Sequence, residues 1–180
     1  HHEAEIAQME SASGLKPMVR CWMHTGFLNV KGEKMSKSLG NFITIRELLQ
    51  RWDGDVFRFL VLSTHYRSPI DFGEEALIQA HNSLERVRKT LKKLDELLKS
   101  NLDDEGSSNV KNIEIWDEAH KKFIEAMEDD FNTPQALSVL FEIVRNINRQ
   151  MQNEIFTKSS ITRIKILFEE WGEILGINFL

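Results

Sequence analysis

The sequence has a single cysteine, Cys21, among its 180 residues and only three prolines. One cysteine excludes an intramolecular disulfide framework, which fits a reducing cytosol and predicts a cytoplasmic protein. No run of eighteen apolar residues occurs, so neither a transmembrane helix nor a membrane partner is expected. A strong excess of one charge sign is also missing. The formal net charge of −5 gives no global footprint for nucleic acid, so any RNA contact must come from local patches.

The most informative feature present is a polar loop, Lys34-Met35-Ser36-Lys37-Ser38, bracketed by Gly32 and Gly40. Its lysines can place ammonium donors on phosphate oxygens, and its serines can donate hydroxyl hydrogen bonds to the same group. When ATP activates an acid, negative charge builds on the phosphates, so catalysis is mainly positioning and electrostatic stabilisation. A lysine pair is more often a solvated surface. The apolar Met35 and Leu39 and the flanking glycines favour a nucleotide-binding loop.

The whole stretch 32–41, GEKMSKSLGN, resembles the KMSKS loop of class I aminoacyl-tRNA synthetases. Four other segments resemble cysteinyl-tRNA synthetases in the same order: HHEAEIAQ at 1–8, WMHTGFL at 22–28, LSTHYRSP at 62–69 and EDDFNTP at 128–134. The agreement in order and spacing is far more specific than the KMSKS loop alone, which many class I synthetases share.

The resemblance implies a reaction. Cysteine and ATP, with Mg²⁺, give cysteinyl adenylate, and the cysteinyl group then passes to the terminal adenosine of tRNA(Cys). The resemblance assigns catalysis to Lys34 and Lys37. It assigns ATP binding to Lys34, Met35, Ser36, Lys37 and Ser38.

The same family selects cysteine by ligating the substrate thiolate to Zn²⁺, because soft zinc prefers thiolate to hydroxyl. Two of the family's zinc ligands, a histidine and a glutamate four residues apart, fall on His1 and Glu5. That spacing places both side chains on one face of a helix. Ala4 replaces the family's Asn or Asp and is expected to point away from the metal. A purification-tag origin of His1 and His2 is the alternative, and the family-like residues that follow favour native sequence.

Two family features are missing. One cysteine cannot supply both cysteine ligands of the zinc, and no HIGH-type motif is present. Both absences predict a C-terminal piece of a synthetase that lacks the N-terminal half of its catalytic domain and is inactive alone. Cys21 lies in a predicted strand and is interpreted as an ordinary buried thiol. On the same strand, His24 is either part of the nucleotide pocket or a hydrogen-bonded core histidine.

Residues 1–70 predict a short mixed α/β segment, which the resemblance implies is the end of a class I Rossmann-type catalytic domain with its KMSKS loop. Its expected elements follow from periodicity and capping signals. They are a helix over 3–13, a strand over 19–30, a loop over 31–41, a helix from a capping box at Thr44 to about Trp52, and a helix capped by Asp55 to about Thr64.

Residues 71–180 predict an antiparallel α-helical bundle, so the fold class is mainly α. The resemblance implies that this bundle is of the tRNA- or anticodon-binding type. The expected elements are a helix capped by Asp71 to about Ser100, a polar loop over 101–112, a helix over 114–128, a helix capped by Asn132 with Pro134 in its first turn, and a helix over 160–175 that stops near Gly176.

Several side chains in these segments have two interpretations. Arg86, Arg88, Lys89, Lys92 and Lys93 form either a phosphate-contacting stripe or, as preferred, a solvated helix face. The segment His65-Tyr66-Arg67 either docks on the catalytic fold or the tRNA, or forms a packed hinge. The aromatic residues of the last helices predict core packing rather than base stacking; they are Trp116, Phe123, Phe168 and Trp171.

Two other functions stay open from the sequence. One is the related ligase that joins cysteine to an amino sugar in mycothiol synthesis, and the other is a non-catalytic module that binds tRNA or a partner. The long helical part with its DDFNTP-like segment favours the tRNA enzyme.

Overall fold

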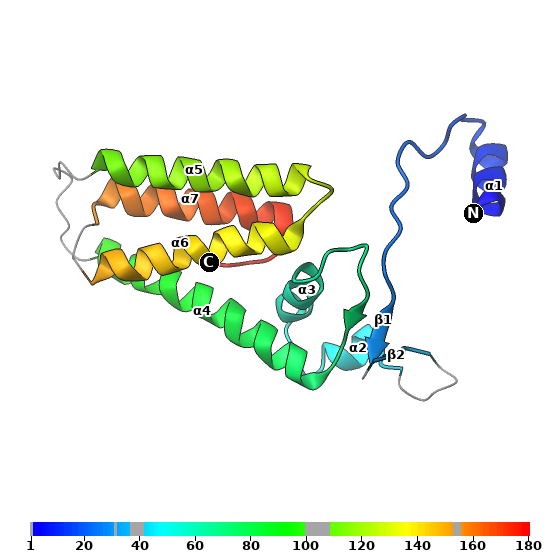
Figure 1. The fold of residues 1–180 in the computed structure, drawn as a ribbon, viewed down its shortest axis with the longest axis horizontal. Helices are drawn as coiled ribbons and strands as arrows, with labels where there is room; N and C mark the ends of the chain where they lie inside the picture. Colours follow the sequence, from blue (N-terminus) through cyan, green and yellow to red (C-terminus); the bar gives the residue numbers. More distant parts are fainter. Residues whose placement is uncertain (1, 31, 37–41, 100–108, 153–155) are drawn as a thin grey trace.

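A computed structural model describes residues 2–30, 32–36, 42–99, 109–152 and 156–180. The predicted site residues His1, Lys37 and Ser38 lie outside the described residues. A small mixed part holds α1 (Glu3–Ser13), β1 (Leu28–Val30), β2 (Glu33–Lys34), α2 (Ile45–Leu48), α3 (Gly54–Leu62) and β3 (Ile70–Asp71). It is followed by four long helices, α4 (Glu74–Lys99), α5 (Asn109–Glu128), α6 (Thr133–Met151) and α7 (Lys158–Leu175), which form the elongated helical body in Figure 1.

The sheet is small, with the strand order β2-β1-β3. Strand β1 pairs antiparallel with β2 and parallel with β3. The predicted strand over 19–30 is wrong for residues 19–27, which run as extended chain without strand pairing. Backbone bonds reach the end of this stretch, where the Gly26 N–H donates to the Tyr66 carbonyl and the Phe27 carbonyl accepts from Ile70. A β-ladder requires successive residues to pair with residues of a neighbouring strand. This pairing begins only at Leu28.

The helices next to the sheet begin at polar caps. The capping box at Thr44 is confirmed, since its hydroxyl accepts from the Glu47 N–H and the Glu47 carboxylate accepts from the Thr44 N–H. Helix α2 is shorter than predicted and continues as turns to Trp52. The cap of α3 is Asp53 rather than Asp55. Asp55 lies inside the helix, and its own N–H donates to the Asp53 carboxylate at 3.2 Å.

The start of α4 also differs from the prediction. Asp71 does not cap the helix but lies in β3, where its carboxylate accepts from the Gly32 N–H at 3.3 Å. Helix α4 begins at Glu74, and the acidic pair Glu74 and Glu75 in its first turn suits the positive end of the helix dipole. It ends at Lys99, close to the predicted Ser100.

Consecutive long helices reverse direction along the body, as Figure 1 shows. Helix α5 packs most extensively on α6, and α4 contacts α3, α6 and α7. Helix α5 begins at Asn109, so the predicted loop is wrong over 109–112. The polar stretch 109–112 can be helical because the residues that follow it extend the same helix. The caps at Asn132 and Gly176 are confirmed.

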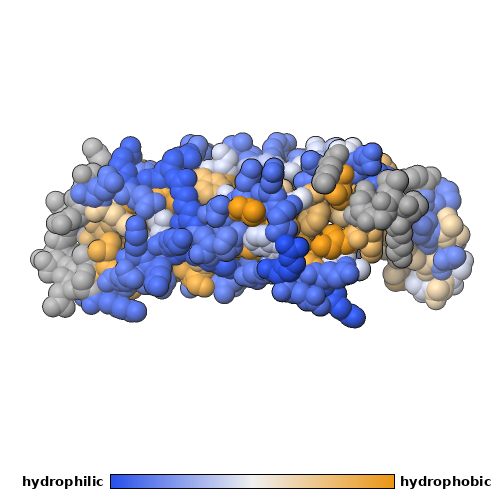
Figure 2. All heavy atoms as spheres, turned by 90° about the horizontal axis from the view of Figure 1, so that it is seen from below, coloured by the Kyte–Doolittle hydropathy of each residue, from blue (hydrophilic) through white to orange (hydrophobic). Residues whose placement is uncertain are grey.

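One hydrophobic core runs through the molecule from Leu48 to Phe179. Trp116, Phe123, Phe168 and Trp171 are all fully buried in it, which confirms core packing. Helix α3 joins this core through Phe59, whose ring meets Phe141 of α6 edge-on at 6.1 Å. The outer face in Figure 2 is mostly hydrophilic, with hydrophobic patches between the polar side chains.

In contrast, none of the described residues between His2 and Thr44 is buried. Across the described part of the chain, no helix combines the length and apolar character needed to cross a bilayer.

Candidate functional site

The predicted loop leaves the sheet at β2. Lys34 is the last residue of that strand and pairs with Asn29 of β1. The next residue, Met35, donates its N–H to the Leu28 carbonyl at 2.9 Å and packs against the core. Ser36 follows in a half-buried position. The hairpin therefore presents the first three of the five predicted ATP-binding residues along one edge of the sheet.

The Lys34 ammonium lies 3.8 Å from the centroid of the Phe27 ring. Both side chains are exposed. An exposed cation–π contact of this kind contributes about 0.5–1 kcal/mol, which orients the lysine weakly. A phosphate oxygen is a much stronger partner for an ammonium group, so Lys34 can exchange the ring for an anion.

Both ends of the loop are anchored. On one side, Gly32 adopts a left-handed φ of +77°, and its N–H donates to Asp71 of β3. On the other side, the capping box at Thr44 fixes the start of α2. Hydrogen bonds from the Thr44 backbone and hydroxyl lower the pKa of Glu47, which keeps that carboxylate ionised as an acceptor. The loop therefore spans two fixed points.

The segment 22–28 lies against the segment that follows α3. The Gly26 N–H donates to the Tyr66 carbonyl at 2.7 Å. A Cβ at Gly26 would lie 2.2 Å from the Ser68 carbonyl oxygen, so only glycine allows this approach. Glycine is thus required at position 26 by close packing and not by a turn conformation.

Tyr66 and Arg67 bind the turn between α5 and α6 through Asp130. The Tyr66 hydroxyl donates to Asp130 Oδ1 at 2.6 Å. Arg67 donates from Nε to Oδ2 at 2.5 Å and from Nη2 to Oδ1 at 3.0 Å. These bonds from Arg67 and then Tyr66 lower the pKa of Asp130 to about 2, and the carboxylate raises the pKa of Tyr66. We call these three residues the Asp130 clamp.

The Asp130 clamp agrees with one interpretation of residues 65–67, a hinge whose polar groups are satisfied, and docking on the catalytic fold or the tRNA stays a prediction. These residues dock on the helical body, and their polar groups are satisfied there. Asp130 itself was not among the predicted site residues. The available signal was that both LSTHYRSP and EDDFNTP resemble one family, but their separation of 63 residues hid the contact.

Comparison with family models gives two matches. Residues 1–82 match the model described as tRNA synthetases class I (C) catalytic domain, and residues 122–180 match the DALR domain. Curated relatives match across nearly the whole chain. The cysteine–tRNA ligase of Heliobacterium modesticaldum is 45% identical and matches 99% of this chain. The chain belongs to the cysteinyl-tRNA synthetase family.

Two other relatives show similar identity and coverage. The cysteine–tRNA ligases of Geobacter sulfurreducens and Thermococcus onnurineus are 43% and 45% identical, and each matches 98% of this chain. The chain spans about two fifths of the length of these relatives, since the matches cover 39%, 37% and 38% of them.

The crystal structure of the ternary complex of Agrobacterium radiobacter K84 agnB2 LeuRS-tRNA-LeuAMS superposes on 91% of this chain with a TM-score of 0.69. Only 22% of that chain is covered and the identity is 20%, so this likeness concerns the fold alone.

The zinc ligation known in cysteinyl-tRNA synthetases can be tested on the described residues. Glu5 lies in the first turn of α1, and its nearest ionic neighbour is His2 at 3.6 Å. No group of three His, Cys, Asp or Glu side chains suited to a metal occurs among the described residues. They do not by themselves fit a zinc site, because a tetrahedral site takes four ligands and only Glu5 of the proposed pair is described.

The structure contradicts the buried thiol at Cys21 and, of the two alternatives for His24, the core histidine. Cys21 is exposed, not a buried thiol. His24 is exposed as well, and its ring lies 5.1 Å from that of His2, which also stacks on Trp22. The extended chain around them is not covered by other described residues, so neither side chain reaches a core.

The predicted phosphate stripe of the cysteinyl-tRNA synthetase helical part loses one member. Arg88 donates to the Asp55 carboxylate at 2.6 Å and to the Asn178 carbonyl at 2.8 Å, so it joins α3, α4 and the chain end. The other members are exposed on α4; they are Arg86, Lys89, Lys92 and Lys93. They fit the preferred interpretation of a solvated face.

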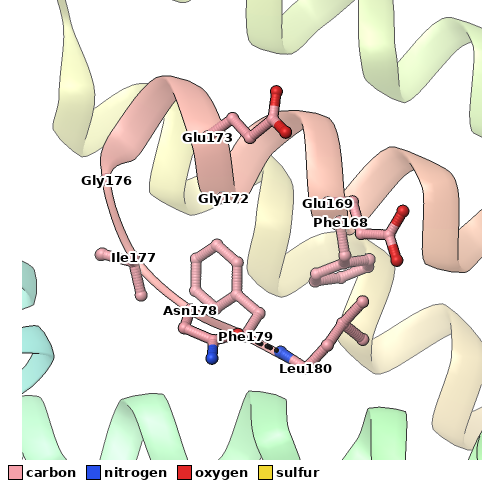
Figure 3. Close-up of a pocket in the computed structure, with 9 residues that line it drawn as sticks. All are labelled: Phe168, Glu169, Gly172, Glu173, Gly176, Ile177, Asn178, Phe179 and Leu180. Carbon is pink, nitrogen blue, oxygen red and sulfur yellow. Dashed lines mark hydrogen bonds between the residues drawn. The ribbon is translucent and has the colours of Figure 1, made fainter.

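The chain end that Arg88 holds folds back along α7 (Figure 3). The Phe179 ring meets Phe168 edge-on at 6.0 Å beside a hollow of about 400 Å³. A Cβ at Gly172 would lie 2.7 Å from the Ile177 carbonyl oxygen, so this glycine allows the return.

Proposed function

We propose that this chain forms part of an enzyme that activates cysteine with ATP and transfers it to tRNA(Cys). The observation that carries the proposal is the β1–β2 hairpin, which holds Lys34, Met35 and Ser36 at a sheet edge inside the region matched by the catalytic-domain model. The DALR match over residues 122–180 supports the tRNA enzyme over the mycothiol ligase. Cytoplasmic placement follows from this function.

The proposal assigns different roles to the two parts of the chain. Residues 1–70 form the part of the catalytic domain that contains the KMSKS loop, and residues 71–180 form the helical tRNA-binding part. Lys34 and Lys37 place ammonium groups on ATP phosphates, where charge develops during activation. Met35 sets the depth of the loop by packing on the core, and the serine hydroxyls of Ser36 and Ser38 donate to the same phosphates.

In this proposal Mg²⁺ accompanies ATP. His1 and Glu5 are proposed as two zinc ligands, of which Glu5 lies in the first turn of α1, with the remaining two outside this chain. Zinc content of the complete protein tests this: Glu5→Ala should lower it, whereas Glu3→Ala on the same turn should not. Equal zinc in both variants would contradict the assignment.

The decisive test of the loop is substitution in the complete protein. Lys37→Ala should lower single-turnover adenylate formation by roughly 10²–10³-fold, the scale of losing one strong transition-state donor. Lys34→Ala tests the second ammonium in the same assay. Lys121→Ala is the matched control, because Lys121 is exposed on α5 and pairs only weakly with Glu125 at 3.8 Å. Activation by the Lys37 variant within about twofold of the parent would contradict the proposal, since a lost donor changes the rate far more.

A further inference from the structure

The segment 22–28, which supports the loop, and the turn between α5 and α6 line the same hollow. An apolar hollow of about 410 Å³ lies between them. Met23 and Phe27 line one side, and Met127 and Phe131 line the other. Beside this hollow, hydrogen bonds join the segment after α3 to the turn between α5 and α6.

The Asp130 clamp supplies that contact. One carboxylate receives hydrogen bonds from the Tyr66 hydroxyl and from both Nε and Nη2 of Arg67. The paired geometry of Arg67 fixes direction as well as distance. The backbone at Asp130 and Phe131 is also unusual, because both residues have φ of +53°. Left-handed backbone is unfavourable for a bulky residue such as Phe131, so the turn is held by its surroundings in one defined shape.

From the Asp130 clamp, a short chain of contacts leads to the loop lysine. Tyr66 accepts the Gly26 N–H on its carbonyl oxygen at 2.7 Å. The next residue, Phe27, accepts from Ile70 at 2.9 Å and carries the Lys34 ammonium on its ring. Each step in this chain is a direct contact. Gly26 has little room to move, because the Ser68 carbonyl lies directly against it.

We propose that Asp130 is a positioning residue that sets the placement of Gly26 and Phe27, and through them Lys34, relative to the helical body. The consequence for activity rests on the proposed function: a helical body shifted by bound tRNA would move the loop lysine through the same contacts. The β1–β3 pairing also holds this segment, so loss of the Asp130 clamp should loosen the loop rather than unfold it.

Amide hydrogen exchange in this chain tests the proposal without any catalytic assay. In Asp130→Asn, exchange at Gly26 and Met35 should be at least about fivefold faster, the lower range of coupling between sites. Asp95→Asn is the matched control, because Asp95 is similarly exposed and pairs with Lys165 at 2.7 Å between α4 and α7, away from the loop. It should leave both amides unchanged. Equal exchange in Asp130→Asn and the parent would overturn the proposal.

A double-variant cycle separates this positioning role from general loosening. Arg67→Gln alone should accelerate Gly26 exchange as Asp130→Asn does, and the double variant should add little, because both changes remove the same contact. Fully additive effects would overturn the proposal.

Kinetics of the complete protein supply the functional readout. Asp130→Asn should lower kcat of adenylate formation by about fivefold with KM for cysteine unchanged, since a positioning defect acts on the transition state. An unchanged kcat would overturn the link to Lys34. If Lys37→Ala had no effect while the exchange results held, the proposed function would fail and the mechanical coupling would stand.

Discussion

Residues 2–44 and residues 45–180 differ in how their shape is maintained. The first region has no buried side chain among its described residues, and Trp22, Met23 and Phe27 are 41%, 51% and 63% exposed. The second region is built on one continuous core. A few hydrogen bonds to the rest of the molecule hold the backbone of the first region in place. Burial of apolar surface stabilises the second region. A concentration of exposed apolar side chains is typical of an interaction surface.

The largest expected contrast is between two tryptophans. Trp171→Ala removes a fully buried ring that stacks on Phe123 at 4.7 Å, and it should lower the free energy of unfolding by about 3–5 kcal/mol. Trp22→Ala in the exposed segment should change it by no more than about 0.5 kcal/mol. Urea unfolding followed by circular dichroism measures both. Similar losses for the two variants would remove the distinction between the regions.

A second contrast uses two glycines that each abut a carbonyl oxygen. Gly172→Ala pushes on the Ile177 carbonyl inside the core and should lower the free energy of unfolding by about 1–3 kcal/mol, as overpacking does. Gly26→Ala, in the first region, pushes on the Ser68 carbonyl, so it should displace the loop locally and leave global unfolding within about 0.5 kcal/mol. The same urea titration applies. A global loss at Gly26 as large as at Gly172 would show that the first region shares the core's cooperativity.

A third contrast compares two capping boxes. Thr157→Ala at the start of α7 should lower global stability by about 1 kcal/mol, because α7 is central to the core. Thr44→Ala removes the equivalent bond at α2, whose only buried side chain is Leu48, and should act locally on that helix. Thermal unfolding compares the two. A greater loss of stability from Thr44→Ala would contradict the assignment of α2 to the edge of the core.

The smallest effect concerns the Asp130 clamp, which lies within the second region and holds the segment that contacts Gly26 of the first region. Because the pKa of Asp130 is lowered from 3.8 to about 2, chiefly by Arg67, the clamp contributes stability above pH 3.8. That contribution should disappear as the pH falls through 2. Carbon NMR of the Asp130 carboxyl should show a midpoint near the lowered value, and Arg67→Gln should move it back toward 3.8. A midpoint that Arg67→Gln does not change would show that this arginine is not the cause.

Much of the second region could be predicted from the sequence because its determinants are local. Helical periodicity placed the core tryptophans and phenylalanines, and the caps at Asn132 and Gly176 depend on residues close in sequence. The wrong caps, Asp55 and Asp71, have carboxylates that bind Arg88 and Gly32, which lie 33 and 39 residues away. Long-range partners of this kind leave no local pattern.

The candidate site shows the same division. Lys34, Met35 and Ser36 could be found from a contiguous motif, and the roles of the five loop residues stay a prediction. The contact between Arg67 and Asp130 could not be predicted from the sequence, since it joins segments 63 residues apart. The strand over 19–27 was overpredicted because apolar residues favour pairing, whereas pairing itself depends on a neighbour that the local sequence does not specify.

The most direct test of the account is cysteine-dependent ATP–pyrophosphate exchange. It would compare the complete protein containing this chain, supplied with zinc and Mg²⁺, with the isolated chain. We predict exchange in the complete protein, its loss on Lys37→Ala, and none in the isolated chain. No cysteine-dependent exchange in the complete protein would contradict the account and leave a tRNA- or partner-binding module as the better explanation.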